Sequence, residues 1–547
     1  MVITASLLAG LASPALACGG LFCNTAQPVV QNAERIVFAV DQQNDVVDTH
    51  VQIFYEGPSD EFAWIVPVAQ QPELFVSTQA LFDQLAVRSG PIFSLNTVIE
   101  GNCSSDFAAG RNLAMADDAA GPPSSPAPQE GGTVEVISEA QVGPYETVTL
   151  RANSEDGLIA FLQENEYDLP SELSSVLAPY VAGEAYFVAL KLQKDKEAGD
   201  ITPLGMRYQG DQASIPIQLT SIAAADDLRL EVYVFADQRA VPSSYLHVDI
   251  NHAAVDWWSF GSNYPDVITL AADEAGGHAF ATDYFGPADA FAFDFQFDRR
   301  ALEAAGSAVD WIQQIARQGV PFNDQLVSLV LAHVEPPPGI PGADFVSCPT
   351  CYENWNPADF DAAAATADLD ETILTPLEEA EVLFDYDYLS RMTSSLSAVE
   401  MTIDPVFVMN EDLSGEDHFV AQTRNADLVF ECGFNREMDK APRRLELADG
   451  RAIDLPSQAW FRENDTTEFE FIRDLGLQKA QVIEQMGERG EGEVVADFTN
   501  DFRAATQNHN RMVRQLVSSC GGCSSSNPAG ALGLIGLLAL LGARRRR

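Results

Sequence analysis

The sequence predicts an α+β fold: a β-rich, antiparallel N-terminal part, then a region of mixed helices and strands, and a long helix near the C-terminal end. Three observations predict this class. Apolar and polar residues alternate along several runs between residues 34 and 298, which is the period of a strand. Short, turn-rich connections separate these runs, which favours antiparallel neighbours. Helical signals become frequent after the proline-rich segment 335–342.

The N-terminal part reads mainly as strands. Residues 34–68 contain three alternating runs separated by turns. We expect a helix next, which is capped at Ser77 or Thr78 and ended by Gly90. Further strands are predicted at 133–137, 147–152, 185–193, 227–237 and 291–298.

The second part mixes both kinds of element. The sequence TPLE at 375–378 has the spacing of a capping box, with proline at the first helical position. Residues 401–410 and 466–473 are predicted to be strands. A helix over about 497–517 is predicted to complete a helical stalk, residues 481–519.

The first residues of the sequence have the pattern of a secretory signal peptide. Residues 1–17 are apolar and end in small residues, with Ala15 and Ala17 at positions −3 and −1 of a cleavage site before Cys18. We expect signal peptidase to cut between Ala17 and Cys18. A lipoprotein signal at Cys18 is the alternative, but that signal favours leucine at −3, where this chain has Ala15.

The last residues combine cysteines, an apolar run and a basic end. Residues 529–543 are uncharged and shorter than the roughly 20 residues of a full membrane span, and the arginines 544–547 follow. One interpretation is a plain membrane anchor. The pattern also resembles the myxococcal C-terminal sorting signal (MYXO-CTERM). That resemblance implies that a sorting protease removes the helix and that Cys520 or Cys523 becomes the lipidated attachment point.

These patterns divide the sequence into five segments and place the protein outside the cytoplasm, attached to the membrane at the cell envelope or the outer surface. The segments are a signal peptide (1–17), a β-rich ectodomain (18–335) with a low-complexity insertion (116–132), a mixed α/β region (343–480), a helical stalk (481–519) and a sorting or anchor segment (520–547).

The charge is strongly negative, with 81 acidic and 31 basic residues and a formal net charge of −50. Such a surface repels nucleic-acid phosphates and anionic lipid headgroups, so we expect neither as a partner of the body of the protein. Salty surroundings that screen the self-repulsion would account for the acidity, as would solubility alone or the binding of Ca²⁺. The EF-hand pattern D-x-[DN]-x-[DN]-G does not occur, so we predict no cofactor and keep Ca²⁺ as the alternative.

Disulfides are the default for cysteines in an exported chain. Six cysteines lie outside the tail: Cys18, Cys23, Cys103, Cys348, Cys351 and Cys432. A bridge between Cys18 and Cys23 would close a short loop, and Cys103 with Cys432 is the long-range pair we expect. The CPTC motif at 348–351 follows a proline-rich segment rather than a strand, and the body contains no second CxxC. We therefore favour structural bridging over a redox or zinc site.

The sequence shows none of the catalytic or nucleotide-binding motifs G-x-S-x-G, H-E-x-x-H, G-x-x-x-x-G-K-[ST] and G-x-G-x-x-G. The densest polar and aromatic patch comprises His247, Asp249, Trp257 and Trp258. Its imidazole and carboxylate could bind a metal, and its indoles could stack on a sugar ring. On an alternating strand, however, the nearby His252 falls on the opposite face. We favour buried structural roles and assign no catalytic, cofactor or metal residue.

Six segments together resemble an exported bacterial family known as domain of unknown function 2330 (DUF2330). They are CGGLFC, QNAERIVFAVD, FAWIVPV, QLTSIAAADDLRLEVYVFADQRAVP, CPTCY and SRMTSSLSAVEMTIDPVFVMN, between residues 18 and 410. The resemblance implies an envelope or surface protein, often with a membrane anchor at one end. It carries over no catalytic residue, because the family has no established activity.

Three hypotheses of function follow. The favoured one is a non-enzymatic binding, adhesion or structural ectodomain that is stabilised by disulfides and meets an extracellular protein or polysaccharide. The second is an exported hydrolase of an unfamiliar type. The third is an adhesion module that depends on a divalent cation.

Overall fold

The computed structural model describes residues 21–22, 31–53, 62–104, 134–165, 167, 173–193, 201–222, 224–293, 295–355, 357 and 359–519. Within these residues the α+β class is confirmed. The predicted signal peptide, insertion and sorting segment lie outside them, as do Ala17, Cys18, Cys23, Cys520 and Cys523.

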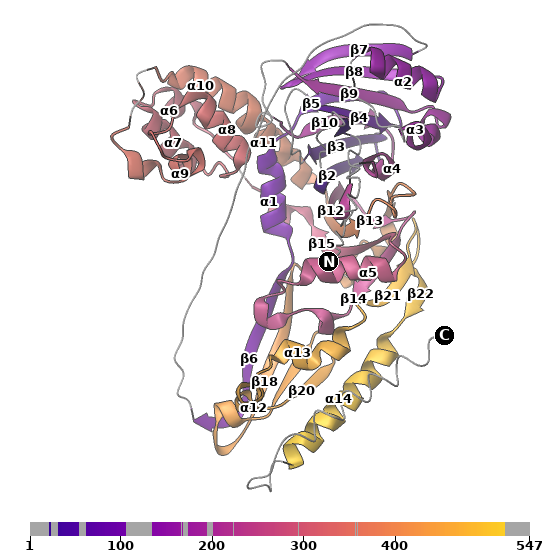
Figure 1. The fold of residues 1–547 in the computed structure, drawn as a ribbon, viewed down its shortest axis with the longest axis vertical. Coiled ribbons are helices and arrows are strands. Elements are labelled where there is room, and N and C mark those ends of the chain that lie inside the picture. The colour runs from indigo at the N-terminus through magenta and orange to yellow at the C-terminus, as the bar shows by residue number, and fades with distance from the viewer. Residues whose placement is uncertain are drawn as a thin grey trace, which may run out of the picture.

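A ten-stranded sheet forms the centre of the molecule (Figure 1), in the order β22-β21-β14-β15-β16-β12-β2-β3-β10-β5. Neighbours are antiparallel except for the parallel pairs β12 with β2 and β14 with β15. The strands are β2 (Gln31–Asp41), β3 (Val46–Ile53), β5 (Glu73–Val76), β10 (Leu204–Gln209), β12 (Ala224–Ala236), β14 (Leu246–Ile250), β15 (Ala279–Pro287), β16 (Tyr388–Leu396), β21 (Ala480–Gln485) and β22 (Glu493–Asp497).

A five-stranded antiparallel sheet packs against one face of the ten-stranded sheet. Its order is β1 (Leu21–Phe22), β4 (Ala63–Val68), β9 (Tyr186–Leu192), β8 (Tyr145–Ala152) and β7 (Val134–Val142). Helices α2 (Glu155–Glu164) and α3 (Leu173–Ala182) cover its outer face. A three-stranded sheet of β11 (Ala213–Ser214), β17 (Val406–Asn410) and β13 (Arg239–Pro242) and the short helix α4 (Ile217–Thr220) complete the cover.

Strand alternation builds this sandwich, because one apolar face of β2 and β12 packs on the smaller sheets. Ile36, Phe38 and Val232 belong to the core between the sheets, whereas Val37 and Phe235 belong to a second core on the other side. The structure thus confirms the alternating strands predicted over these segments.

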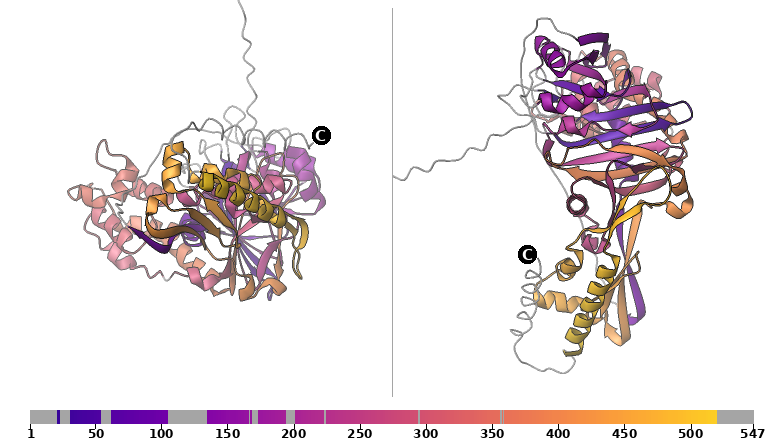
Figure 2. Two further views of the ribbon diagram at one scale, coloured as in Figure 1. Left: turned by 90° about the horizontal axis from the view of Figure 1, so that it is seen from below. Right: turned by 90° about the vertical axis from the view of Figure 1, so that its right-hand side faces the viewer.

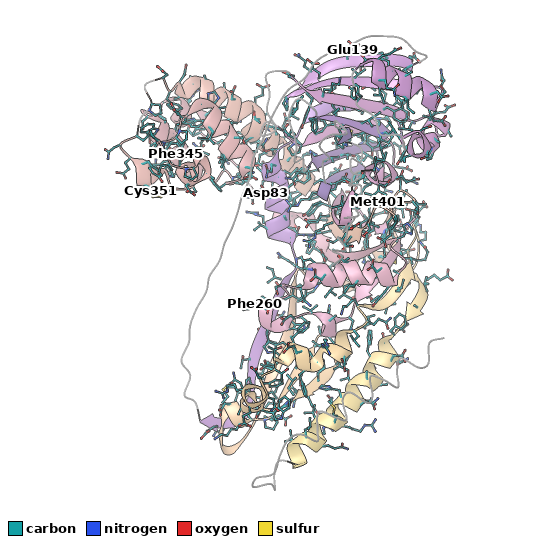
Figure 3. The ribbon with its side chains drawn as sticks, in the orientation of Figure 1. Asp83, Glu139, Phe260, Phe345, Cys351 and Met401 are labelled. Atoms are coloured by element: carbon teal, nitrogen blue, oxygen red, sulfur yellow. A yellow bond between two sulfur atoms is a disulfide. The ribbon has the colours of Figure 1, made fainter. Side chains whose placement is uncertain are left out.

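The second core lies between the large sheet and a lobe of helices, which projects to one side in Figure 1. Figure 3 labels Phe345 and Cys351 within this lobe. The helices that contribute to the second core are α1 (Gln79–Ser89), α6 (Arg299–Glu303), α7 (Ala308–Arg317), α8 (Asp324–His333), α9 (Gly342–Ser347), α10 (Ala362–Leu369) and α11 (Thr375–Glu379). The boundaries predicted for α1 are confirmed, since Thr78 caps it through its side chain and Gly90 follows its last residue.

A third core fills a lower lobe, which extends away from the sandwich in Figure 2. Its four-stranded sheet has the order β20 (Ala452–Leu455), β19 (Arg443–Leu447), β18 (Thr423–Glu437) and β6 (Ile92–Ser104). Helices α5 (Tyr264–Glu274), α12 (Gln458–Asn464), α13 (Glu468–Ile472) and α14 (Thr499–Ser519) accompany it.

The boundary predicted between a β-rich ectodomain and a mixed region near residue 335 does not separate two structural units. Strand β16 comes from the second region but lies between β15 and β12 in the middle of the large sheet. The predicted first region also contains α6, α7 and α8. The position of β16 in the sheet is decided by its pairing with strands that are distant in sequence, and local composition does not reveal such pairing.

Four local predictions were wrong. Residues 291–298 form no strand in their described part, and Phe291, Phe293 and Phe297 pack into the second core. The alternating segment 466–473 contains α13, whose capping box joins Thr467 and Glu470. No side-chain cap occurs at α11, because it continues a π-helix (Asp370–Leu374).

The fourth correction concerns the helical stalk predicted at 481–519. Only α14 is helical there, since β21 and β22 occupy the earlier residues. Phe502 and Val513 of α14 are buried, so this helix packs on the lower lobe.

The described residues include no helix long and apolar enough to cross a membrane.

Candidate ligand-binding site

The structure separates the polar and aromatic patch predicted around β14. His247 is buried, and its Nε2 lies 3.0 Å from Thr282 Oγ1, while Asp249 is exposed. Both share one face of β14. Val248 and Ile250 point from the opposite face into the third core, which contains Trp257 and contacts Trp258. The imidazole and the indoles therefore do not converge on one ligand.

The side chains of this patch make structural contacts. Trp257 Nε1 donates a hydrogen bond of 2.9 Å to the His252 carbonyl oxygen, and its ring meets that of Phe93 edge to face. Burial lowers the pKa of His252 to about 4, so its imidazole stays neutral at physiological pH. Among the described residues, no three or more His, Cys, Asp and Glu side chains are grouped to hold a metal ion.

Cys348 and Cys351 form a disulfide between α9 and the following 3₁₀ turn, Pro349–Tyr352. Cys432 on β18 is also disulfide-bonded. The expected partner, Cys103, lies on the neighbouring strand β6. In the pairing of these two strands, Gly101 lies opposite Cys432 and Cys103 lies opposite Arg436, and the register shifts between these two pairs. The Cys103–Cys432 bridge stays a prediction.

A buried ionic cluster lies on the helical side of the large sheet. Asp283 accepts hydrogen bonds from Tyr264 at 2.7 Å and from Thr393 at 2.6 Å, and Arg391 Nε lies 3.7 Å from its carboxylate. Arg424 donates to Tyr264 and is 3.9 Å from Asp283. Tyr264 and Thr393 thus satisfy the Asp283 carboxylate, whereas Arg391 Nε is buried near it without a hydrogen-bond partner among the described residues. None of these groups lines the cavity described next, so we assign the cluster to structure.

A cavity of about 320 Å³ opens between the two sheets of the sandwich. Strands β2, β3 and β10 form one wall, β4 forms the facing wall, and the ends of α3 and α4 close one side. Its apolar and aromatic lining includes Ile36, Phe38, Val51, Trp64, Val66 and Met206. Its exposed lining residues, among them Ala69, Gly183 and Gln212, mark the side that meets solvent.

Glu34 is the unusual side chain of this cavity. It stands on the same face of β2 as Ile36 and Phe38, and 6% of its surface is exposed. Its Oε2 has no hydrogen-bond partner among the described residues. Burial raises the pKa of this carboxyl to about 7, because the ionised form has lost water and gained no donor in its place.

A second carboxylate, Asp404, lines the cavity near α3 and α4 and is held in a defined orientation. The Tyr180 hydroxyl and the Gln218 backbone N–H each donate to its Oδ1 at 3.0 Å. Burial raises the pKa of Asp404, and these hydrogen bonds act in the opposite direction. On the opposite wall, Thr49 Oγ1 lies 3.3 Å from the Tyr208 hydroxyl. Polar groups thus face part of a cavity whose lining is mainly apolar.

The charge of the lining is one-sided. Of the side chains that line the cavity in the described part of the chain, Glu34 and Asp404 are the charged ones, and Arg and Lys are absent from this set. The same set contains no His or Cys. A carboxyl with a pKa near 7 can transfer protons, but no nucleophile with a neighbouring base is visible beside it. A partly apolar lining with oriented polar groups suits the binding of a small molecule.

The sequence contained a signal for Glu34 that we did not use. In QNAERIVFAVD, the glutamate occupies the apolar phase of the strand, two residues before Ile36 and four before Phe38. Charged residues are rarely buried without a partner, so a glutamate in the apolar phase of a strand indicates a candidate functional position. Asp404 gave no comparable signal, because only the fold brings it near Tyr180.

One comparison with known proteins found a match. The model of a family described as "Uncharacterized protein conserved in bacteria (DUF2330)" matches residues 12–298, more than half of the 547 residues. The matched part contains Glu34 and all of β2, β3, β4 and β10, which build the cavity walls. No curated protein and no solved structure matches the chain.

Proposed function

The chain belongs to the bacterial family DUF2330, whose description names no activity, and we therefore propose a function from the cavity itself. The protein is an exported, non-enzymatic binding protein that is attached to the cell envelope or displayed on the outer surface. Its sandwich takes up a small amphipathic molecule from the surroundings. The cavity between the two sheets is the observation that carries this proposal.

The size and lining of the cavity support binding. Ligand sites in proteins typically measure about 300–1,000 Å³ and combine apolar walls with a few polar groups that orient the ligand. A volume of about 320 Å³ can hold a small molecule of about one to three rings or a short chain. Trp64 and Phe38 offer aromatic surface, while Glu34 and Asp404 offer the polar groups.

The two ends of the sequence support the proposed location. Residues 1–17 have the pattern of a signal peptide, and 520–547 that of an anchor or sorting segment. The net charge of −50 argues against nucleic acid as a partner. A binding protein outside the cytoplasm would meet its ligand in the medium or in the envelope.

A fluorescent probe can test the function. N-phenyl-1-naphthylamine is a neutral, largely apolar molecule that brightens when it leaves water, and we expect it to bind one site per chain. The variant Val51→Trp fills the cavity from β3 and should abolish the signal. The matched control Val494→Trp adds the same side chain at an exposed position of β22 and should leave binding unchanged.

Two results would contradict the proposed function. One is the absence of saturable probe binding to the parent protein. The other is equal binding by the parent and by a folded Val51→Trp variant, since the probe would then occupy a different surface. Circular dichroism of each variant establishes that it is folded. If Val51→Trp does not fold, Ile36→Phe supplies a smaller filling substitution in the same cavity.

A further inference from the structure

We propose that the ligand of this cavity carries a protonated amine, and that the amine binds to the Glu34 carboxylate. This inference rests on the proposed function and adds the chemical class of the ligand. Three features of the described residues carry it: the unpartnered carboxylate, the sign of the charges in the lining, and the aromatic rings around the cavity.

The first feature is that Glu34 lacks a donor. A buried carboxylate normally accepts two or more hydrogen bonds or pairs with a cation, because removing it from water is costly. Glu34 Oε2 has no partner in the described part of the chain, while Arg35, the next residue, lies on the other face of β2 and pairs with Glu231. An ammonium group in the cavity would supply both the charge and the N–H donors that are missing.

The second feature is the sign of the charge. Glu34 and Asp404 are the charged side chains of the lining, and both are acidic. An anionic ligand would bring a third negative charge into a space of low polarity, which is strongly unfavourable. At longer range, the net charge of −50 attracts cations and repels anions before either reaches the protein.

The third feature is aromatic surface. Phe38, Trp64, Tyr180 and Tyr208 line the cavity. The face of an aromatic ring carries partial negative charge and attracts ammonium groups, most strongly where water is excluded. The same rings pack against the apolar part of a ligand. An organic amine with a ring or a short alkyl chain fits both properties.

The competing explanation is that Glu34 is simply a protonated carboxyl buried for structural reasons. A protonated carboxyl donates a hydrogen bond and would favour a neutral ligand with an acceptor oxygen over an amine. The two explanations predict opposite preferences between ligands of equal shape.

Three probes of similar shape distinguish these explanations: 2-phenylethylamine, 2-phenylethanol and phenylacetate. Each is titrated calorimetrically into the purified full chain at pH 8, and by displacement of N-phenyl-1-naphthylamine. We expect the amine to bind about 10- to 100-fold more tightly than the alcohol, which is the range of a charge-assisted hydrogen bond. Phenylacetate should bind more weakly than the alcohol.

The variant Glu34→Gln tests the residue. It keeps the shape of the side chain and removes the charge, so the preference for the amine over the alcohol should disappear while binding of the alcohol persists. The matched control Glu146→Gln removes one charge from an exposed position of β8, away from the cavity, and should keep the preference. Unchanged alcohol binding also shows that Glu34→Gln is folded.

The dependence on pH gives a second readout. The other titratable groups that line the cavity are Tyr180, Tyr208 and Asp404, and the tyrosines stay neutral because burial raises their pKa further. The amine remains protonated throughout. With the pKa of Glu34 at about 7, its ionised fraction rises about tenfold between pH 6 and pH 8, and amine affinity should rise with it.

The outcomes separate this inference from the proposed function. Equal binding of amine and alcohol by the parent protein overturns the amine inference and leaves a ligand-binding cavity. Tighter binding of the alcohol supports the protonated, structural carboxyl. A preference for the amine that survives in Glu34→Gln overturns the role of Glu34. Failure of every probe, including the fluorescent one, overturns the proposed function as well.

Discussion

Replacing Glu34 with glutamine should make the protein more stable, and the gain should depend on pH. Burial raises the pKa of Glu34 from its ordinary 4.5 to about 7. The folded state therefore binds the proton more tightly than the unfolded state does. The contribution of Glu34 is least unfavourable below pH 4.5 and becomes more unfavourable as the pH rises towards 7. Glutamine cannot ionise and avoids this loss.

The size of the effect follows from the two pKa values. A difference from 4.5 to about 7, at about 1.4 kcal/mol per pH unit, corresponds to about 3 kcal/mol. The side chain is 6% exposed, so solvent screens this effect little. The free energy of unfolding of Glu34→Gln, relative to the parent, should thus increase by about 3 kcal/mol between pH 4.5 and pH 8.

Urea denaturation followed by circular dichroism measures this difference. Comparing variant and parent at each pH cancels the titration of the many other acidic residues. The control Glu146→Gln has an exposed side chain and should show the same difference from the parent at both pH values. A Glu34→Gln difference that also stays constant would show that Glu34 is not desolvated in the folded state, and would refute the reasoning behind its assignment.

Three further substitutions test buried contacts of the fold outside the cavity lining. Trp311→Ala removes a fully buried indole from the core beneath the helical lobe, and urea denaturation should show a loss of about 3–5 kcal/mol; a loss below 1 kcal/mol would contradict that burial. Asp283→Asn leaves the buried Arg391 with less compensating charge and should lower the free energy of unfolding by about 3–5 kcal/mol. Because the pair is buried, high salt should reduce this loss only slightly. Gly205→Ala places a methyl group into the ring of Phe75 beside β10 and should lower stability by about 1–3 kcal/mol, unless that ring can move aside.

Local structure could be read from the sequence where one interaction decided it. Helix α1 is an example, because the side chain of Thr78 caps its first turn and Gly90 follows its end. The apolar faces of β2 and β12 were likewise predictable, since alternation alone assigns each side chain to one face. These features need no knowledge of distant residues.

Where two local patterns compete, the sequence can mislead: the segment TTEFEFIR alternates like a strand, but the capping box of Thr467 and Glu470 starts a helix there. Features that depend on distant residues could not be read from local patterns at all. The place of β16 between β15 and β12 depends on pairing across long stretches of chain. Composition therefore suggested a boundary near residue 335 where the sheet is continuous.

The same distinction explains why the cavity was found only in the structure. The two carboxyl groups of the site differ in how far the sequence alone could reveal them. Glu34 is visible in the sequence, because it stands in phase with Ile36 and Phe38, although a charged residue at the start of a strand can equally lie beyond the core. What distinguishes the two cases is the cover: β4 and the end of α3 must close over β2 before the carboxylate loses water.

Asp404 depends wholly on tertiary structure, since its contacts with Tyr180 and Gln218 bridge 224 and 186 residues of sequence. The same cavity is therefore lined by Asp404, which accepts hydrogen bonds, and by Glu34, which accepts none at its Oε2 among the described residues. A purely structural cavity has no need of this difference, because two satisfied groups or none would cost less. A site that receives a cation needs one carboxylate without a partner. Glu34, rather than Asp404, is accordingly the residue whose replacement should remove the preference for an amine.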